Sequence, residues 1–114
     1  NYIMNSTTID HDCYIEDNVT LSSNVVLGGN VYVMKNSTLG IKSAIHQNQV
    51  IGSYTMIGMG SIVTKRIKLI PGFVFYGKPV KKIKKNDLAL NKYKINYKTL
   101  KIEINRFNKI KKSQ

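Results

Sequence analysis

The sequence predicts an all-β solenoid in which short parallel strands stack in successive coils. Three observations predict it: an aliphatic residue recurs at every sixth position over half of the chain, mostly small side chains lie two residues before it, and glycine or a polar residue often follows it. A period of six fits neither a 3.6-residue helix nor a simple alternating strand. It does fit short strands joined by tight turns, each strand pointing one aliphatic side chain inwards.

The repeat runs without interruption from Ile3 to Val63. Ile, Leu and Val make up 31 of the 114 residues, yet they fill all eleven positions of this phase: Ile3, Ile9, Ile15, Leu21, Leu27, Val33, Leu39, Ile45, Ile51, Ile57 and Val63. The position two residues earlier holds Thr7, Cys13, Val19, Val25, Val31, Ser37, Ser43, Gln49, Thr55 and Ser61. Glycines directly after the aliphatic residue, such as Gly28 and Gly40, are expected to supply the positive φ of the turns.

The repeat stops at Ile67, and turn residues follow at Pro71, Gly72, Gly77 and Pro79. We expect one more extended pass here, with Phe73, Phe75 and Val80 capping the core. This divides the chain into a solenoid over residues 1–84 and a basic extension over residues 85–114. In the extension, the alternation of Tyr93, Ile95 and Tyr97, and then of Leu100, Ile102 and Ile104, indicates one or two amphipathic strands. An amphipathic helix from about Asn86 fits the same residues, and the pattern leaves both open.

The charge is concentrated in the second part of the chain. Residues 1–67 carry equal numbers of acidic and basic side chains, so the net charge of +12 lies entirely in residues 68–114. Such a segment suits an anionic ligand, but no nucleic-acid-binding motif accompanies it, so we expect no nucleic-acid partner. No apolar run has the length of a membrane span or a signal sequence, so we expect a soluble, cytoplasmic protein without a membrane partner.

The hexads resemble the hexapeptide-repeat left-handed β-helix, in which three hexads make one triangular coil. This resemblance implies a left-handed solenoid of about three and two-thirds coils and a homotrimer. Residues 18 apart then stack on one another. His11, in the stretch "TIDHDCYIED", is expected to face outwards at a corner, above Gly29, Gln47 and Lys65. A second column holds Ser23, Ile41, Met59 and Gly77.

A more specific resemblance rests on "HDCYIEDNVTLSSNVVLGGNVYVMKNSTLGIKSAI", "IGMGSIVTKRI" and "GKPVKKIK". Residues 8 to about 84 are similar to the C-terminal domain of acyl-CoA-dependent sugar acetyltransferases, in the subgroup of sialic-acid O-acetyltransferases and sugar-nucleotide amino N-acetyltransferases. The resemblance implies that His11 is the general base, that Asp12 assists it, and that the backbone N–H of Gly29 stabilises the oxyanion. Relatives carry an N-terminal Rossmann-like domain that holds the sugar nucleotide.

The same resemblance implies acetyl-CoA as co-substrate and a sugar or sugar nucleotide as acceptor. It places coenzyme A contacts on Gly29 and, along the solenoid, on Thr20, Ile41 and Met59. From their charge, we expect Lys65 and Lys78, together with Lys81 and Lys82, to lie near the coenzyme phosphates.

Two other interpretations compete with an acetyltransferase. A non-catalytic trimeric scaffold whose basic tail binds a polyanion would explain the charge without using His11. A zinc site is not expected, because the chain has two histidines and the β-helical carbonic anhydrases use three. We interpret Cys13 as a small residue of the repeat, with no nucleophilic role, and His46 as a structural turn residue.

Overall fold

The computed structural model describes all 114 residues, as thirteen β-strands followed by two α-helices. Eleven strands of two residues each make up the repeat: β1 (Tyr2–Ile3), β2 (Thr8–Ile9), β3 (Tyr14–Ile15), β4 (Thr20–Leu21), β5 (Val26–Leu27), β6 (Tyr32–Val33), β7 (Thr38–Leu39), β8 (Ala44–Ile45), β9 (Val50–Ile51), β10 (Met56–Ile57) and β11 (Ile62–Val63). The remaining elements are β12 (Phe73–Gly77), β13 (Val80–Lys85), α1 (Asp87–Lys92) and α2 (Tyr97–Lys112).

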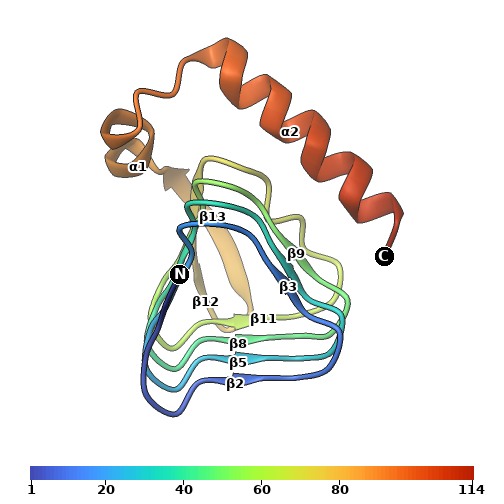
Figure 1. Ribbon diagram of the computed structural model, residues 1–114. Coiled ribbons are helices and arrows are strands. Elements are labelled where there is room, and N and C mark those ends of the chain that lie inside the picture. The colour runs from blue at the N-terminus through green and yellow to red at the C-terminus, as the bar shows by residue number, and fades with distance from the viewer.

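The repeat folds into a triangular prism whose coils stack in parallel (Figure 1). The first sheet has the order β1-β4-β7-β10-β12-β13, the second β11-β8-β5-β2 and the third β3-β6-β9. Pairing is offset by 18 residues on every side, as in Tyr2 with Thr20, Thr8 with Val26 and Tyr14 with Tyr32. The predicted left-handed β-helix is therefore confirmed.

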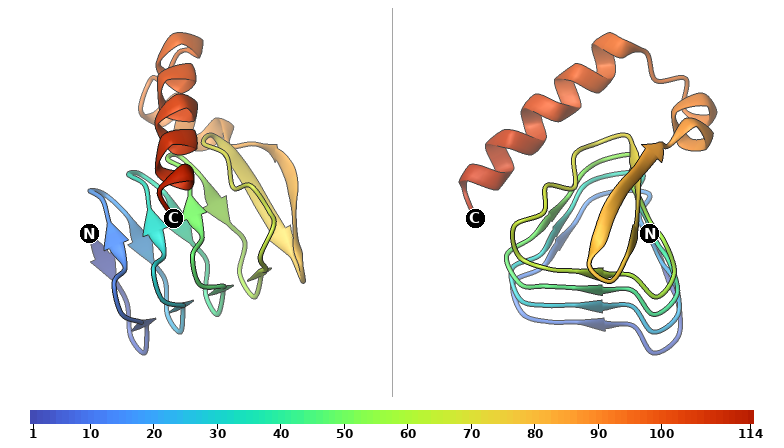
Figure 2. Two further views of the ribbon diagram at one scale, coloured as in Figure 1. Left: turned by 90° about the vertical axis from the view of Figure 1, so that its right-hand side faces the viewer. Right: turned by 180° about the vertical axis from the view of Figure 1, so that it is seen from behind.

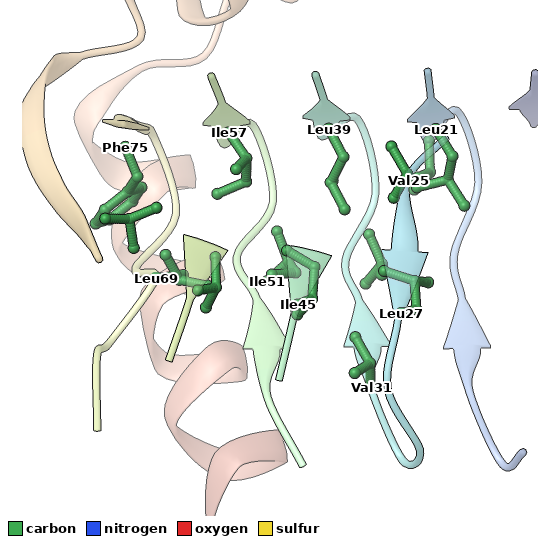
Figure 3. Close-up of a cluster of buried hydrophobic side chains, with 14 residues drawn as sticks. Leu21, Val25, Leu27, Val31, Leu39, Ile45, Ile51, Ile57, Leu69 and Phe75 are labelled. Atoms are coloured by element: carbon green, nitrogen blue, oxygen red, sulfur yellow. The ribbon is translucent and has the colours of Figure 1, made fainter. Parts of the chain in front are cut away.

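The predicted aliphatic residues form a continuous core along the axis of the prism. Fourteen buried residues belong to one cluster, in which Leu21, Leu39 and Ile57 follow one another coil by coil (Figure 3). Phe75 continues this column at the far end of the prism, and Val80 is buried beside it. The extra extended pass is β12, which pairs in parallel with β10 and then turns back into the antiparallel strand β13. The predicted cap of the core is confirmed.

The turns differ from the prediction in how they use glycine. Positive φ falls three residues after the aliphatic residue, mainly at asparagines: Asn18, Asn24, Asn30, Asn36 and Asn48. Asparagine tolerates this left-handed conformation better than most side chains, so these turns do not need glycine there. The glycines directly after the aliphatic residue serve close packing instead. A Cβ at Gly40 would lie 2.6 Å from the backbone nitrogen of Met59 in the next coil.

The extension is helical, so the interpretation as strands is wrong and the helical alternative is right. The side-chain oxygens of Asn86 and Asn96 accept hydrogen bonds from Ala89 N–H and Thr99 N–H, and cap the starts of α1 and α2. In α2 the side chains that face the solenoid include Glu103, Phe107 and Ile110, a helical spacing of three to four residues. Ile102, which supported the alternating pattern, is exposed.

Helix α2 lies across the outer surface of the third sheet (Figures 1 and 2). Phe107 is fully buried there against Met34 and Val50. A polar network fixes the same helix. The Arg106 guanidinium donates to both carboxylate oxygens of Glu16 at 2.5 and 2.7 Å, and Ser53 Oγ donates to Glu103 at 2.7 Å. The helix is therefore held by side chains from three successive coils.

This network makes the docking of α2 depend on pH. Burial raises the pKa of Glu16, but hydrogen bonds from Arg106, Tyr32 and the backbone of Lys35 outweigh it and leave that pKa below its ordinary value. The pKa of Glu103 is also lowered, since hydrogen bonds from Arg106 and Ser53 outweigh burial. A depressed carboxyl pKa stabilises the folded state above the pKa of the unfolded chain, and this stability is lost as the pH falls through the folded pKa.

We therefore expect the free energy of unfolding to fall as the pH drops below about 4, where unfolded glutamate takes up its proton. Urea unfolding at pH 7 and pH 3 measures this difference. The variant Glu16→Gln/Glu103→Gln is expected to lose less of its free energy of unfolding between pH 7 and pH 3 than wild type. Asp17→Asn, which changes an exposed carboxylate, is expected to lose as much as wild type. A full acid loss in the double variant would contradict the assignment.

Neither helix has both the length and the apolar character that crossing a membrane would require.

Candidate functional site

The stretch around His11 forms the corner between the second and third sheets. Strand β2 ends at Ile9 and β3 begins at Tyr14, so residues 10–13 make the turn. Asp10 Oδ1 accepts a hydrogen bond from the backbone N–H of His11 at 2.7 Å, and Asp12 has a positive φ of 58°. Short polar side chains suit such a turn because they bond their own backbone. The turn leaves the imidazole of His11 outside the prism.

His11 and Asp12 form a pair on this corner. Nδ1 of His11 lies 3.2 Å from Oδ2 of Asp12, and the two side chains are 69% and 77% exposed. When Nδ1 donates its proton to the carboxylate, the neutral imidazole carries its free lone pair on Nε2. The pair therefore presents an oriented proton acceptor to whatever binds at the corner.

Gly29 lies directly beneath this imidazole, as the 18-residue stacking predicts. A Cβ at Gly29 would lie 2.7 Å from Cε1 and 2.8 Å from Nε2 of His11, so only glycine leaves room for the ring in this position. The neighbouring amides are used within the fold: Gly28 N–H donates to Ile45 O and Asn30 N–H to His11 O. The Gly29 N–H has no acceptor within the chain.

A backbone N–H without an acceptor is found at this corner in more than one coil. The N–H of Gly29 is the one whose residue lies against the His11 ring. One coil further on, the N–H of Gln47 also lacks an acceptor. At Gly29 the histidine of the preceding coil lies over the unpaired amide's own residue, since a Cβ there would be 2.8 Å from Nε2 of His11. A proton acceptor and a fixed hydrogen-bond donor thus lie side by side.

We expect Gly29→Ala to displace the His11 ring without unfolding the prism. The added Cβ meets only side-chain atoms of an exposed histidine, which can swing away into solvent. If the corner is catalytic, kcat should fall by roughly tenfold or more, because misplacement of a catalytic group by about 1 Å can cost as much as 100-fold. The control is Gly60→Ala. A Cβ added there meets no atom within 4 Å, although the backbone has a positive φ of 71°. Circular dichroism and steady-state kinetics on both variants test this, and an unchanged kcat in Gly29→Ala would contradict it.

Cys13 belongs to the core side of the same turn. Its Sγ donates to the backbone carbonyl of Gly28 at 3.2 Å, and the half-buried side chain packs against the aliphatic core. It therefore fills the small position of the repeat, as the sequence predicts. His46 is exposed, with Nδ1 3.1 Å from the carbonyl of Gln47.

Four of the remaining predicted residues lie at two different edges of the second sheet. Lys65 shares the His11 corner, in the fourth coil. Ile41 and Met59, which are 45% and 67% exposed, lie at the opposite corner, between the first and second sheets. Lys78 follows β12 at the end of that same column. Within one chain, His11 and the pair Ile41 and Met59 are therefore separated by the width of the second sheet. The strands of this sheet, β2, β5, β8 and β11, form one face of the prism (Figure 1).

Thr20 lies away from both corners. It is part of β4 in the first sheet and lines a hollow beneath α1 together with Asn36, Thr38 and Tyr93. Lys81 and Lys82 are in β13, and the Lys82 ammonium lies 4.6 Å from the ring centre of Phe73. Thus the structure brings His11, Asp12, Gly29 and Lys65 to one corner and leaves the other predicted residues elsewhere.

One contact at this corner has no signal in the sequence. The side chain of Gln114, beyond the end of α2, donates to the carbonyl of Asn30 at 2.8 Å, and Asn30 N–H donates to His11 O. The C-terminus of the chain therefore reaches the His11 corner. Nothing in the hexad pattern relates residues so far apart. Across the chain, no group of three or more His, Cys, Asp and Glu side chains is placed to hold a metal ion.

Comparison with solved structures gives a consistent class of neighbour: acyltransferases of the hexapeptide-repeat β-helix family. The Arabidopsis UDP-N-acetylglucosamine acyltransferase is 29% identical, with a TM-score of 0.76 over 84% of this chain and 33% of its own. LpxA from Acinetobacter baumannii is 28% identical, with a TM-score of 0.78 over 87% of this chain and 38% of its own. No protein-family model and no curated protein sequence matches the chain.

A third neighbour was solved with ligands. A mutant of perosamine N-acetyltransferase from Caulobacter crescentus, in complex with CoA and GDP-perosamine, is 25% identical, with a TM-score of 0.67 over 70% of this chain and 37% of its own. This chain spans about a third of the length of these proteins.

Proposed function

We propose that this protein transfers an acetyl group from acetyl-CoA to an amine or hydroxyl of a sugar or sugar nucleotide, with His11 as general base. The observation that carries the proposal is the arrangement at the corner. An oriented imidazole lies against a glycine whose N–H has no partner in the fold. The neighbours support the class of reaction, since they are acyltransferases and one of them was solved with CoA and a sugar nucleotide.

The first step is attack on the thioester. The nitrogen or oxygen of the acceptor substrate attacks the carbonyl carbon of the acetyl group. At the same time, Nε2 of His11 accepts the proton of that amine or hydroxyl. The Asp12 carboxylate accepts from Nδ1–H and holds the ring in this orientation, and it stabilises the imidazolium that forms. The exposed position of His11 leaves Nε2 open to both substrates.

The second step is collapse of the tetrahedral intermediate. The carbonyl oxygen becomes negatively charged, and the Gly29 N–H donates to it from a rigid turn. The carbon–sulfur bond then breaks, and the proton passes from Nε2 of His11 to the departing thiolate of CoA. The acetyl group passes directly to the acceptor, so the step needs no enzyme nucleophile. Cys13, whose thiol is bonded to Gly28 O and packed on the core, is free of any role in it.

We further propose that the site is completed between copies of the chain in a homotrimer. The second sheet presents exposed Val26 and Ile62 and is covered by neither helix (Figure 1). Its two edges carry different parts of the predicted site, His11 on one and Ile41 with Met59 on the other. A ligand that extends from His11 can contact the apolar pair only when a second copy supplies it. Light scattering measures the mass, and a monomer at all concentrations would contradict this arrangement.

The proposed function is tested by binding and turnover. Acetyl-CoA is expected to raise the melting temperature, because a ligand that binds only the folded state stabilises it. Release of free CoA is then followed with a panel of amino-sugar nucleotides and sugars. Absence of both a thermal shift and acceptor-dependent CoA release would contradict the proposal and favour a non-catalytic scaffold.

A further inference from the structure

The C-terminal end of α2 gathers lysines beside the corner that carries His11. Helix α2 crosses the third sheet towards this corner, where Gln114 bonds to Asn30 (Figure 2). Three lysines and one asparagine line a hollow on this side of the molecule: Lys68 from the fourth coil, and Asn108, Lys111 and Lys112 from the last turns of α2. The hollow thus forms only where the helix meets the prism.

The charge in this hollow is not compensated within the chain. No acidic residue lines it, and no lysine of the protein forms an ion pair. The acidic side chain of α2, Glu103, and the one that reaches the helix from the prism, Glu16, are both bound to Arg106. Burial lowers the pKa of Lys111, and the nearby Lys68 ammonium lowers it further. The fold therefore holds like charges together without a counter-ion, an arrangement that a bound anion relieves.

We infer that Lys68, Lys111 and Lys112 form a binding site for a phosphate or diphosphate group of a nucleotide-bearing substrate. Ammonium groups bind phosphate oxygens through charge-assisted hydrogen bonds, and the Asn108 amide adds a further donor. The hydrogen bonds from Gln114 to Asn30 and from Asn30 to His11 bring the end of α2, which carries Lys111 and Lys112, to the corner of the proposed reaction centre. The lysine cluster by itself supports the anion site. Only the identity of the ligand depends on the proposed function.

Two ligands carry the required chemistry. One is the adenosine 3′,5′-bisphosphate part of coenzyme A, and the other is the nucleoside diphosphate of a sugar-nucleotide acceptor. Both would extend along the corner from His11 towards the fourth coil. Competition experiments separate them.

Inorganic pyrophosphate is the first probe, titrated calorimetrically into the full chain at low ionic strength, where surface charges are least screened. The variant Lys111→Ala/Lys112→Ala is expected to weaken binding roughly tenfold or more, and Lys68→Ala to weaken it as well. The control Lys98→Ala/Lys101→Ala removes the same charge from exposed positions of the same helix. It is expected to change the affinity by less than about twofold.

Adenosine 3′,5′-bisphosphate and UDP are then tested for displacement of pyrophosphate. Displacement by one and not the other identifies the source of the phosphate group. Absence of pyrophosphate binding, or equal weakening in the two double variants, would overturn the site. Failure of both nucleotides to compete would overturn the ligand assignment. The variant His11→Gln is expected to keep the pyrophosphate affinity, so the anion site can stand even where acetyl transfer fails.

Discussion

Replacement of His11 by glutamine is expected to lower kcat for acetyl transfer by about 10²–10⁴-fold, the usual contribution of a positioned general base. Glutamine keeps a polar side chain of similar reach but accepts no proton at neutral pH. Because the imidazole is exposed and its only side-chain partner is Asp12, the substitution should leave the melting temperature and the binding of acetyl-CoA nearly unchanged.

His46 provides the matched control, since it is also exposed at the same corner of the prism, about two coils further along. His46→Gln is expected to keep kcat within about threefold of wild type, as for a surface substitution away from the chemistry. The rate of CoA release by both variants, measured at fixed times, tests this prediction. If His11→Gln retains wild-type kcat, His11 is not the base and the proposed mechanism fails.

Replacement of Leu39 by alanine is expected to cost about 2–5 kcal/mol of the free energy of unfolding, the range for large-to-small substitutions in a rigid core. Leu39 is fully buried, and it packs between Leu21 and Ile57 in the central column (Figure 3). Both neighbours are held by their own coils, so the structure has little freedom to close the cavity. Coils of a solenoid contact only their neighbours, so a weak coil weakens the coupling on both sides.

The control is Leu88→Ala, the same chemical change at an exposed position of α1. It is expected to change stability by less than about 0.5 kcal/mol. Urea unfolding monitored by circular dichroism gives both values. A loss below about 1 kcal/mol for Leu39→Ala would show that the column relaxes around the cavity and is not rigid.

The solenoid could be predicted from the sequence because each hexad repeats the same local demand. An inward aliphatic side chain, a small residue before it and a turn after it are set within six residues, and the coil follows by repetition. The use of glycine could not be predicted correctly. Gly40 is required by the approach of Met59 from the next coil, a contact between coils that the hexad alone does not describe.

The secondary structure of the segment that forms α2 could not be predicted from its sequence. Its residues alternate and also follow a helical spacing, so the sequence left strand and helix open. Tertiary contacts decide it, because Phe107 and Glu103 find partners on the third sheet only when both lie on one face of a helix. The basic cluster at the end of α2 follows from this docking and has no signature of its own in the sequence.

One part of the candidate site, the stacking of His11 on Gly29, could be predicted from the sequence. The 18-residue spacing places His11 above Gly29, and the structure has them in contact range. The same spacing grouped Ile41 with Met59, but it could not show that this pair lies at the far edge of the sheet from His11. Separation across a sheet depends on how three sides close into a triangle, which a linear repeat does not encode.

The attachment of α2 to three coils also bears on the order of folding. A solenoid of equivalent coils can begin to fold at any point and extend in both directions. Helix α2 is different, since Glu16, Tyr32 and Ser53 come from the first, second and third coils and all belong to the network that fixes it. These partners are in place only after all three coils have formed. We therefore expect docking of the C-terminal helix to follow formation of these coils and to couple them into one cooperative unit.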